Sequence, residues 1–380
     1  MQVEHIPLQH TPSGTSRELR VCRFGQRGAR PKAYIQAALH ADELPGILVA
    51  HELRKLLTNA EETGELIGEV VLVPAANPIG LSQDVLGVHH GRFALADGQN
   101  FNRGFADLSK GLKLNVGQMS VVRDTNDAVE THDQSGPLRR ALRAAAEAGA
   151  HGGVSESSAL KAQLLALAID ADVVLDLHCD GEAVMHLYTL PSLAARVEPL
   201  ARLLRAEVCL TALESGEGPF DEACSRPWAV AAAAMPDAKF AAACLAATVE
   251  LRGERDVFPT MAADDAIAIF EFLKVEGIVG GLSPTLPSHV CYQLPLAATE
   301  PLIAPVSGVI VYQVALGENV CAGHTVAQLV DPVSGDETPL RARTSGLLFA
   351  RSSSRWASAG KRIGKIAGAE IIRSGKLLSP

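Results

Sequence analysis

The sequence predicts an α/β domain with a parallel or mixed sheet flanked by helices, followed by a small all-β domain. Up to Val279, apolar runs of strand length alternate with amphipathic runs of helix length, which is the pattern of an α/β sheet. Residues 282–287 are linker-like, and short alternating stretches broken by glycine and proline follow them. We therefore expect two domains, residues 1–287 and 288–380.

In the first domain, short apolar runs bounded by turn residues predict strands, and helical periodicity predicts helices. The expected strands are 18–24, 33–39, 68–74, 173–178, 207–211 and 247–251. The expected helices are 46–57, 137–150, 157–169, 193–206, 228–247 and 264–279. Residues 81–135 show little periodicity, and a loop of that length in a compact domain tends to carry function.

Composition excludes several classes of protein. The chain has 47% hydrophobic residues, 20% charged residues and a net charge of −9, so no broad attraction to nucleic acid or anionic membranes is expected. Its first residues lack the apolar core of a signal peptide, and Pro236, Asp237 and Lys239 interrupt its most apolar stretch. Seven scattered cysteines without a Cys-x-x-Cys pattern indicate reduced thiols and a cytoplasmic protein.

The first candidate site lies just after strand 33–39, where His40 and Glu43 follow each other at His-x-x-Glu spacing. An imidazole and a carboxylate can converge there on one metal ion, since open α/β sheets bind ligands at the carboxyl ends of strands. The spacing is common by chance, so its weight depends on partners elsewhere in the chain.

A second strand end supplies such a partner. Strand 173–178 ends in Asp176-Leu177-His178, and His178 would complete the three His or Glu ligands that zinc takes in hydrolytic sites. Asp176 either orients this histidine or caps the neighbouring strand. Taken alone, His178 fits a hydrogen-bonded strand-end histidine better than a ligand.

Glu250 ends another apolar strand and should border a cleft. A carboxylate there can take a proton from metal-activated water, whereas the alternative is a salt bridge with Arg252 or Arg255.

The aperiodic segment 81–135 contains Arg92, Asn102 and Arg103. Guanidinium groups bind carboxylates and stabilise oxyanions, so the loop suits an anion. Ordinary ion pairs on a solvated loop are the alternative, and for Arg92 alone the better one.

Together these segments resemble the succinylglutamate desuccinylase/aspartoacylase family, within the zinc carboxypeptidase superfamily, over roughly residues 20–280. The resemblance rests on the order and separation of His40-Ala41-Asp42-Glu43, Asn77-Pro78, Asn102-Arg103, Asp176-Leu177-His178 and Val249-Glu250. It implies a zinc-carboxypeptidase-like α/β fold and one zinc ion per chain.

The resemblance also implies a role for each matched residue. The zinc ligands would be His40, Glu43 and His178, and Glu250 would be the general base and later the proton shuttle to the leaving amine. Arg92 would polarise the scissile carbonyl, and Asn102 with Arg103 would bind a substrate carboxylate. The chain departs from the family where residues 94–98 lengthen the loop, where 104–136 form an insertion, and where Arg252 replaces an expected small residue such as glycine.

The C-terminal part contains a faint repeat, in which 301–310 parallels 339–348 and 322–326 parallels 359–363. Two related halves predict a β-sandwich or flattened barrel and resemble lipoyl- and biotinyl-type domains. Those domains carry their modified lysine on the hairpin between the halves, but the corresponding segment 331–338 has no lysine. We expect a domain that packs on, shields or oligomerises the catalytic part, which leaves a homo-oligomer open.

These expectations converge on a zinc-dependent amidohydrolase that removes the acyl group from an N-acyl amino acid or a related small carboxylate. A metallocarboxypeptidase acting on short peptides is the first alternative, and a catalytically silent binding protein with the same fold is the second. The long loop and the extra domain favour a small closed site and hence deacylation. The chain lacks a Gly-x-Ser-x-Gly elbow and a phosphate loop, which argues against serine catalysis and nucleotide hydrolysis.

Overall fold

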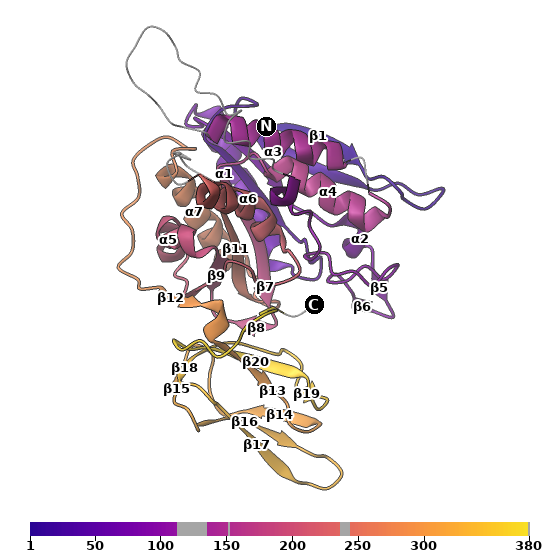
Figure 1. Ribbon diagram of the computed structural model, residues 1–380, viewed down its shortest axis with the longest axis vertical. Coiled ribbons are helices and arrows are strands. Elements are labelled where there is room, and N and C mark those ends of the chain that lie inside the picture. The colour runs from indigo at the N-terminus through magenta and orange to yellow at the C-terminus, as the bar shows by residue number, and fades with distance from the viewer. Residues whose placement is uncertain (112–134, 151–152, 236–243, 379–380) are drawn as a thin grey trace.

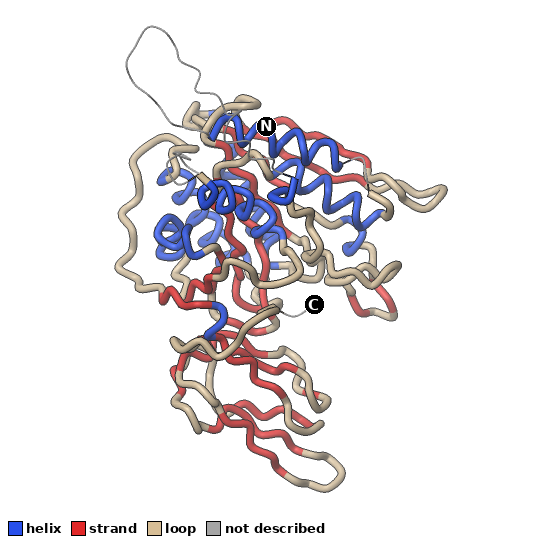
Figure 2. The backbone as a smooth tube through the Cα atoms, in the orientation of Figure 1, coloured by secondary structure: helices blue, strands red, loops and turns tan. Residues whose placement is uncertain are grey.

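The computed structural model describes residues 1–111, 135–150, 153–235 and 244–378. A large α/β body lies at the top in Figure 1 and a smaller all-β body below it. Figure 2 shows strands and loops making up the lower body, with a single short helical turn, η3 (Leu296–Ala298), at the junction. The predicted fold class is therefore confirmed.

A nine-stranded mixed sheet runs through the large body in the order β1-β2-β4-β3-β7-β11-β9-β10-β12. The central pairs β4/β3, β3/β7 and β7/β11 are parallel, whereas β1/β2, β2/β4 and β11/β9 are antiparallel. The strands are β1 (Gln2–Pro7), β2 (Glu18–Phe24), β3 (Lys32–Ala37), β4 (Glu69–Val73), β7 (Val173–Asp180), β9 (His186–Thr189), β10 (Val208–Thr211), β11 (Leu245–Gly253) and β12 (Tyr292–Pro295).

Helices cover both faces of this sheet. The first face carries α1 (Pro45–Glu62), α5 (Ala194–Leu203) and α7 (Pro259–Val275), which share one hydrophobic core. The second carries α3 (Ser135–Ala150), α4 (Glu156–Ala168) and α6 (Phe220–Ala234), which share another. Short elements fill the connecting loop: α2 (Pro78–Leu81), β5 (Asp84–Val85), β6 (Val88–His89) and η1 (Leu108–Gly111).

One helix was predicted in the wrong place. The alanine-rich run 228–247 was expected to be helical, but α6 begins at Phe220 and ends at Ala234, and β11 begins at Leu245. Residues 245–247 are buried between β7 and β9, so strand pairing overrides the helix propensity of alanine here. The remainder of the predicted helix includes residues 236–243, which lie outside the described part.

The central strands bring the predicted site residues to one edge of the sheet. β7 lies between β3 and β11, with Ala37 opposite Leu177 and His178 opposite Glu250. Strands buried on both faces have largely apolar sequences, and β7 and β11 each also carry a buried polar residue, Asp176 and Thr248. His40, His178 and Glu250 therefore meet at the carboxyl edge.

The smaller body is a sandwich of two antiparallel sheets, β13-β20-β18-β15 and β17-β16-β14-β19, and their inner faces share one apolar core. Its strands are β13 (Thr299–Ile303), β14 (Gly308–Tyr312), β15 (Asn319–Val320), β16 (Thr325–Val330), β17 (Glu337–Arg341), β18 (Gly346–Arg351), β19 (Trp356–Ala357) and β20 (Arg362–Ala367). Residues 331–336, within the predicted hairpin segment 331–338, connect β16 to β17 at the bottom of Figure 1, farthest from the α/β body. The likeness to lipoyl-type domains stays a prediction.

Several contacts join the two bodies. β8 (Glu182–Ala183), just after β7, pairs with β18, and Nε of Arg351 donates to Oε2 of Glu182 at 2.7 Å. Lys365 on β20 forms an ion pair with Asp180. β12 lies beyond residue 287 yet still pairs with β10 of the large sheet, and the predicted division at residue 287 stays a prediction.

Two further sequence expectations bear on the class of protein. All seven cysteines are unpaired. Among the described residues, no helix is both long and apolar enough to cross a membrane.

Candidate metal centre and active-site pocket

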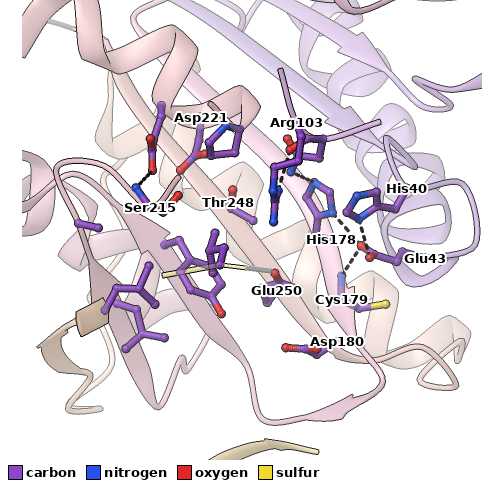
Figure 3. A pocket seen from close by; sticks show the side chains of 18 of the residues that line it. His40, Glu43, Arg103, His178, Cys179, Asp180, Ser215, Asp221, Thr248 and Glu250 are labelled. Atoms are coloured by element: carbon purple, nitrogen blue, oxygen red, sulfur yellow. Dashed lines mark hydrogen bonds and ion pairs between the residues drawn. The ribbon is translucent and has the colours of Figure 1, made fainter. Parts of the chain in front are cut away.

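Three predicted zinc ligands come together at the carboxyl edge of the sheet. Ligand atoms of His40, Glu43 and His178 all lie within 4.8 Å of one another, and the three residues are buried. The Glu43 carboxylate lies between the histidines, with Oε1 2.8 Å from Nδ1 of His40 and Oε2 2.7 Å from Nδ1 of His178. Oε2 also accepts the backbone N–H of Cys179 at 3.0 Å, which fixes the carboxylate against β7 (Figure 3).

The far nitrogen of each histidine is held by an acceptor. Nε2 of His40 lies 2.8 Å from Oδ1 of Asn100, and Nε2 of His178 lies 2.9 Å from Oδ2 of Asp176. The Asn100 oxygen also accepts the backbone N–H of Asn102, which fixes the orientation of this amide. These acceptors would hold a proton on Nε2 of each ring and leave Nδ1 as the nitrogen that binds a metal, as in metal-ligating histidines.

The charges around the trio favour a cation. Burial raises the pKa of Glu43, but His40 and His178 outweigh it and hold that pKa well below its usual range. Burial lowers the pKa of His178, but Asp176 and Glu43 outweigh it and raise that pKa well above its usual value. The same carboxylates would stabilise a dication, so the donor set fits a zinc ion.

Backbone conformation places His40. Ala38, at the end of β3, has φ +57°, a left-handed conformation that a residue with a Cβ adopts only when its surroundings enforce it. The turn after Ala38 is held by the long loop, because the N–H of Ala41 donates to the carbonyl of Gly91 at 3.0 Å. A Cβ on Gly91 would lie 2.0 Å from the backbone nitrogen of Asp42, so only glycine allows this approach.

Glu250 reaches the same pocket from β11. Its Oε2 is buried and makes no hydrogen bond within the described part of the chain, and the predicted alternative of a salt bridge is not formed with Arg252, which instead pairs with Asp265. Burial, Asp180 and Glu43 raise the pKa of Glu250 to about 8. A carboxyl group with a pKa near neutrality suits proton transfer at physiological pH.

Arg92 contacts two of the predicted metal ligands directly. Its Nη1 donates to Oε1 of Glu43 at 3.0 Å and lies 3.3 Å from Nδ1 of His40. The side chain also lines the pocket. The predicted role in polarising the scissile carbonyl stays a prediction, and contact with a ligand carboxylate is a second role that the geometry offers.

Asn102 and Arg103 both line the pocket, in agreement with the idea of an anion-binding loop. Oδ1 of Asn102 accepts the N–H of Phe220 at 2.9 Å, and Nδ2 lies 3.2 Å from Nε2 of His178. Nη1 of Arg103 donates to the carbonyl of Asn102 at 2.7 Å. Asn102 therefore ties the loop to α6 and to the trio, which leaves Arg103 as the better candidate for a substrate carboxylate.

Other pocket residues were not singled out from the sequence. The start of α6 and the preceding loop contribute Ser215, Asp221 and Glu222, and the C-terminal sandwich contributes Arg362 and Lys365. The acidic pair Asp221-Glu222 after Gly218-Pro219 resembles an ordinary helix start, so only its burial would have marked it. Arg362 and Lys365 enter through contact between distant parts of the chain, which leaves no local pattern. Cys179 lines the pocket, but burial raises the pKa of its thiol, so it stays a bystander.

The protein is thus an α/β protein whose pocket combines a buried His-Glu-His group, a carboxyl group of raised pKa and arginines. Residues 29–139, which include His40, Glu43, Arg92 and Arg103, match the family model of the Succinylglutamate desuccinylase/Aspartoacylase catalytic domain. This match, together with solved structures named for the same family, confirms the resemblance of the chain to that family. His178 and Glu250 lie outside the matched segment.

The solved structures match over nearly the whole chain. A succinylglutamate desuccinylase/aspartoacylase family protein from Shewanella amazonensis SB2B shares 25% identity, covering 97% of this chain and 98% of that one, with a TM-score of 0.81. Its counterpart from Shewanella frigidimarina NCIMB 400 shares 22% identity, covers 97% of each chain and has a TM-score of 0.80. The product-bound ectoine utilization protein EutE (DoeB) from Ruegeria pomeroyi shares 19% identity over 96% and 95% of the two chains, with a TM-score of 0.67. The last two show a common fold only. No curated protein matches the chain.

Gly91→Ala should destabilise the protein by about 1–3 kcal/mol, because the new methyl group would clash with the backbone after His40. Zinc affinity should also fall, because the clash displaces the turn that holds His40. Thermal unfolding and a zinc titration measure both effects. Gly149→Ala is the matched control: it lies in α3 with nothing within 4 Å of its added Cβ, and should stabilise by about 0.5–1 kcal/mol. Equal melting temperatures for the two variants would contradict this account.

The raised pKa of Glu250 predicts how metal-free protein depends on pH. The pKa of Glu250 rises from 4.5 in the unfolded chain to about 8 in the folded protein, so folding favours the protonated carboxyl. The contribution of Glu250 to stability is therefore complete below about pH 4.5 and is lost as the pH rises to about 8. The Glu250→Gln side chain cannot ionise. The melting temperature of this variant, relative to that of the wild type, should therefore increase between about pH 5 and pH 8. The exposed Glu337→Gln in β17 should show no such trend. A constant difference between Glu250→Gln and the wild type would refute the shift.

Proposed function

We propose that the protein is a zinc-dependent amidohydrolase that releases the acyl group from an N-acyl amino acid or a related small carboxylate. The observation that carries this proposal is that Glu250, Arg103 and the buried trio His40, Glu43 and His178 line a single pocket. The match to a desuccinylase/aspartoacylase catalytic domain supports the same chemistry. We further propose one zinc ion per chain and a cytoplasmic location, the latter because the cysteines are unpaired.

His40, Glu43 and His178 would hold the metal, with Asn100 and Asp176 fixing the imidazole rings. When bound, zinc supplies a Lewis acid that polarises a carbonyl group and lowers the pKa of water. Glu250 takes the proton of the attacking water at its unpartnered carboxylate and returns it to the departing amine nitrogen. Arg103 binds the substrate carboxylate bidentately, which places the amide beside Glu250. Arg92 donates to the carbonyl oxygen as negative charge develops on it.

A metallocarboxypeptidase would use the same residues, so pocket access decides between the two activities. Leu296, Arg362, Lys365 and Leu378, all from the C-terminal part, line the pocket opposite the α/β body. We expect these side chains to restrict the room for a peptide chain beyond the scissile bond, which would favour a small substrate. Side-by-side assays of N-acetyl and N-succinyl amino acids against short peptides, with and without chelator, test this choice. If peptides are hydrolysed faster than N-acyl amino acids, the protein is a metallocarboxypeptidase and the deacylase proposal is wrong.

Glu250→Ala should retain about one zinc per chain but lose turnover by on the order of a hundredfold or more, since the proton acceptor is removed and no ligand is touched. Metal analysis and kcat for the best N-acyl amino acid measure the two effects. Glu337→Ala, on the exposed face of β17, should match the wild type in both. Full activity in Glu250→Ala would rule out this mechanism.

Arg92→Met separates two roles for Arg92. If the guanidinium stabilises the carbonyl oxygen, kcat should fall on the order of a hundredfold with zinc content retained. If it acts chiefly on Glu43, zinc affinity should fall while the zinc-saturated enzyme keeps its kcat. We expect the first result, and measuring kcat at saturating zinc alongside the zinc dissociation constant tells the two apart.

A further inference from the structure

The segment that follows β20 returns from the sandwich to the α/β body (Figure 1), and we call its residues 372–378 the strap. The N–H groups of Leu377 and Leu378 both donate to the carbonyl of Ser215, at 2.8 and 3.1 Å. Leu377 is only 7% exposed and packs in an apolar core that β9 and β10 share with β18. Leu378 lines the pocket, so the strap forms part of the pocket wall.

The loop that the strap binds has an unusual backbone. Three consecutive residues, Gly216, Glu217 and Gly218, have φ values of +108°, +64° and +58°. Glycine adopts such values freely, but they are unfavourable for Glu217 because of its Cβ, so surrounding contacts have to hold this residue in place. One such contact is the ion pair between Glu217 and Lys376 of the strap. The strap also packs directly against the loop, since a Cβ added at Gly216 would lie 3.3 Å from Lys376.

A second set of hydrogen bonds joins the same loop to the loop that carries Arg103. The carbonyl of Glu217 accepts the N–H of Gly104 at 2.6 Å, and the carbonyl of Gly218 accepts the N–H of Phe105 at 3.1 Å. Gly104 and Phe105 follow Arg103 directly in the sequence, and Arg103 is the candidate for binding the substrate carboxylate. The loop before α6 therefore connects the strap to the substrate-binding loop.

Burial of apolar surface alone does not account for the strap. The core would shield Leu377 from water even if the neighbouring residues made no contact with the loop. The strap instead donates two N–H groups to one carbonyl and pairs Lys376 with Glu217. An exposed ion pair contributes little by itself. Backbone hydrogen bonds next to a buried leucine hold a loop more firmly, because they open only when the leucine leaves its core.

We propose that the strap positions the substrate-binding loop and that Leu377 is the positioning residue that anchors the strap. The loop 215–218 transmits the position of the strap to Gly104, the neighbour of Arg103. The inference rests on the proposed deacylase function, in which Arg103 binds the substrate carboxylate. Release of the strap should spare the metal ligands and the proposed base, and so weaken substrate binding more than it slows the chemical step.

Leu377→Ala tests the proposal, because it removes the buried anchor but keeps every backbone donor. The amides of Gly104 and Phe105 should exchange with solvent deuterium faster by on the order of tenfold, whereas those of β3 and β7 should exchange as in wild type. KM for the best N-acyl amino acid should rise by on the order of tenfold, while kcat changes by less than about threefold. Leu377→Met, which refills the core, should restore the exchange rates and KM.

Two further variants separate positioning from a general loss of stability. Leu329→Ala removes a fully buried leucine of β16 from a different core, that of the sandwich. It should lower the melting temperature but leave KM and the exchange of both amides unchanged. Gly216→Ala disturbs the same contact from the loop side, since alanine is strained at φ +108° and its Cβ meets Lys376. It should raise KM and accelerate exchange of the same two amides.

Hydrogen exchange keeps the inference separate from the proposed function. If the wild type hydrolyses no N-acyl amino acid, the deacylase is wrong, yet faster exchange of Gly104 and Phe105 in Leu377→Ala would still support the strap. If these amides exchange in Leu377→Ala as they do in wild type or in Leu329→Ala, the strap does not position the loop, whatever the activity. An active enzyme in which exchange accelerates but KM stays constant would also overturn the inference.

Discussion

The carboxylate of Glu43 is the interaction on which the candidate site depends. Its two oxygens contact the imidazoles of His40 and His178, the guanidinium of Arg92 and the backbone N–H of Cys179. A buried carboxylate is tolerated only when its charge is balanced and its oxygens are hydrogen-bonded. These partners come from three segments: the turn after β3, the end of β7 and the long loop. Glu43 thereby ties the start of α1, the end of β7 and the long loop into one unit.

The C-terminal sandwich also changes the pKa values of carboxyl groups in the pocket. Asp180 continues β7 past His178 and is one of the groups that raise the pKa of Glu250. Lys365 on β20 pairs with Asp180 and holds the pKa of that carboxyl at about 2 against the effect of burial. Lys365 also lowers the pKa of Glu250. The second body thus moderates the basicity of the residue that we propose as the base.

Sequence patterns found those site residues that follow directly from strand ends. His40, Glu43, His178 and Glu250 could be recognised because they lie near the carboxyl ends of largely apolar parallel strands, where ligands bind in such sheets. Arg92, Asn102 and Arg103 could be recognised because their loop lacks periodicity.

The remaining pocket residues depend on tertiary contacts that no local pattern records. Asp221 and Glu222 were missed because the alanine-rich stretch drew the predicted helix toward residue 228, whereas α6 starts at Phe220. Arg362 and Lys365 were missed because their place in the pocket depends on the packing of β18 and β20 against β8 and Asp180. The pairing that decides their role spans more than 180 residues of sequence.

Arg252 stands where the resemblance implied a small residue such as glycine, next to the residue that we propose as the base. Between Glu250 and Gly253 the pairing of β11 with β7 shifts by one residue, and Arg252 takes φ +64° in this bulge, where glycine would be free of strain. An arginine there costs roughly 1–2 kcal/mol, but its guanidinium binds both carboxylate oxygens of Asp265 on α7. That contact ties the bulge to the helix layer behind it. Because a bulge redirects the side chains next to it, the contact between Arg252 and Asp265 stabilises the turn beside Glu250, which lines the pocket.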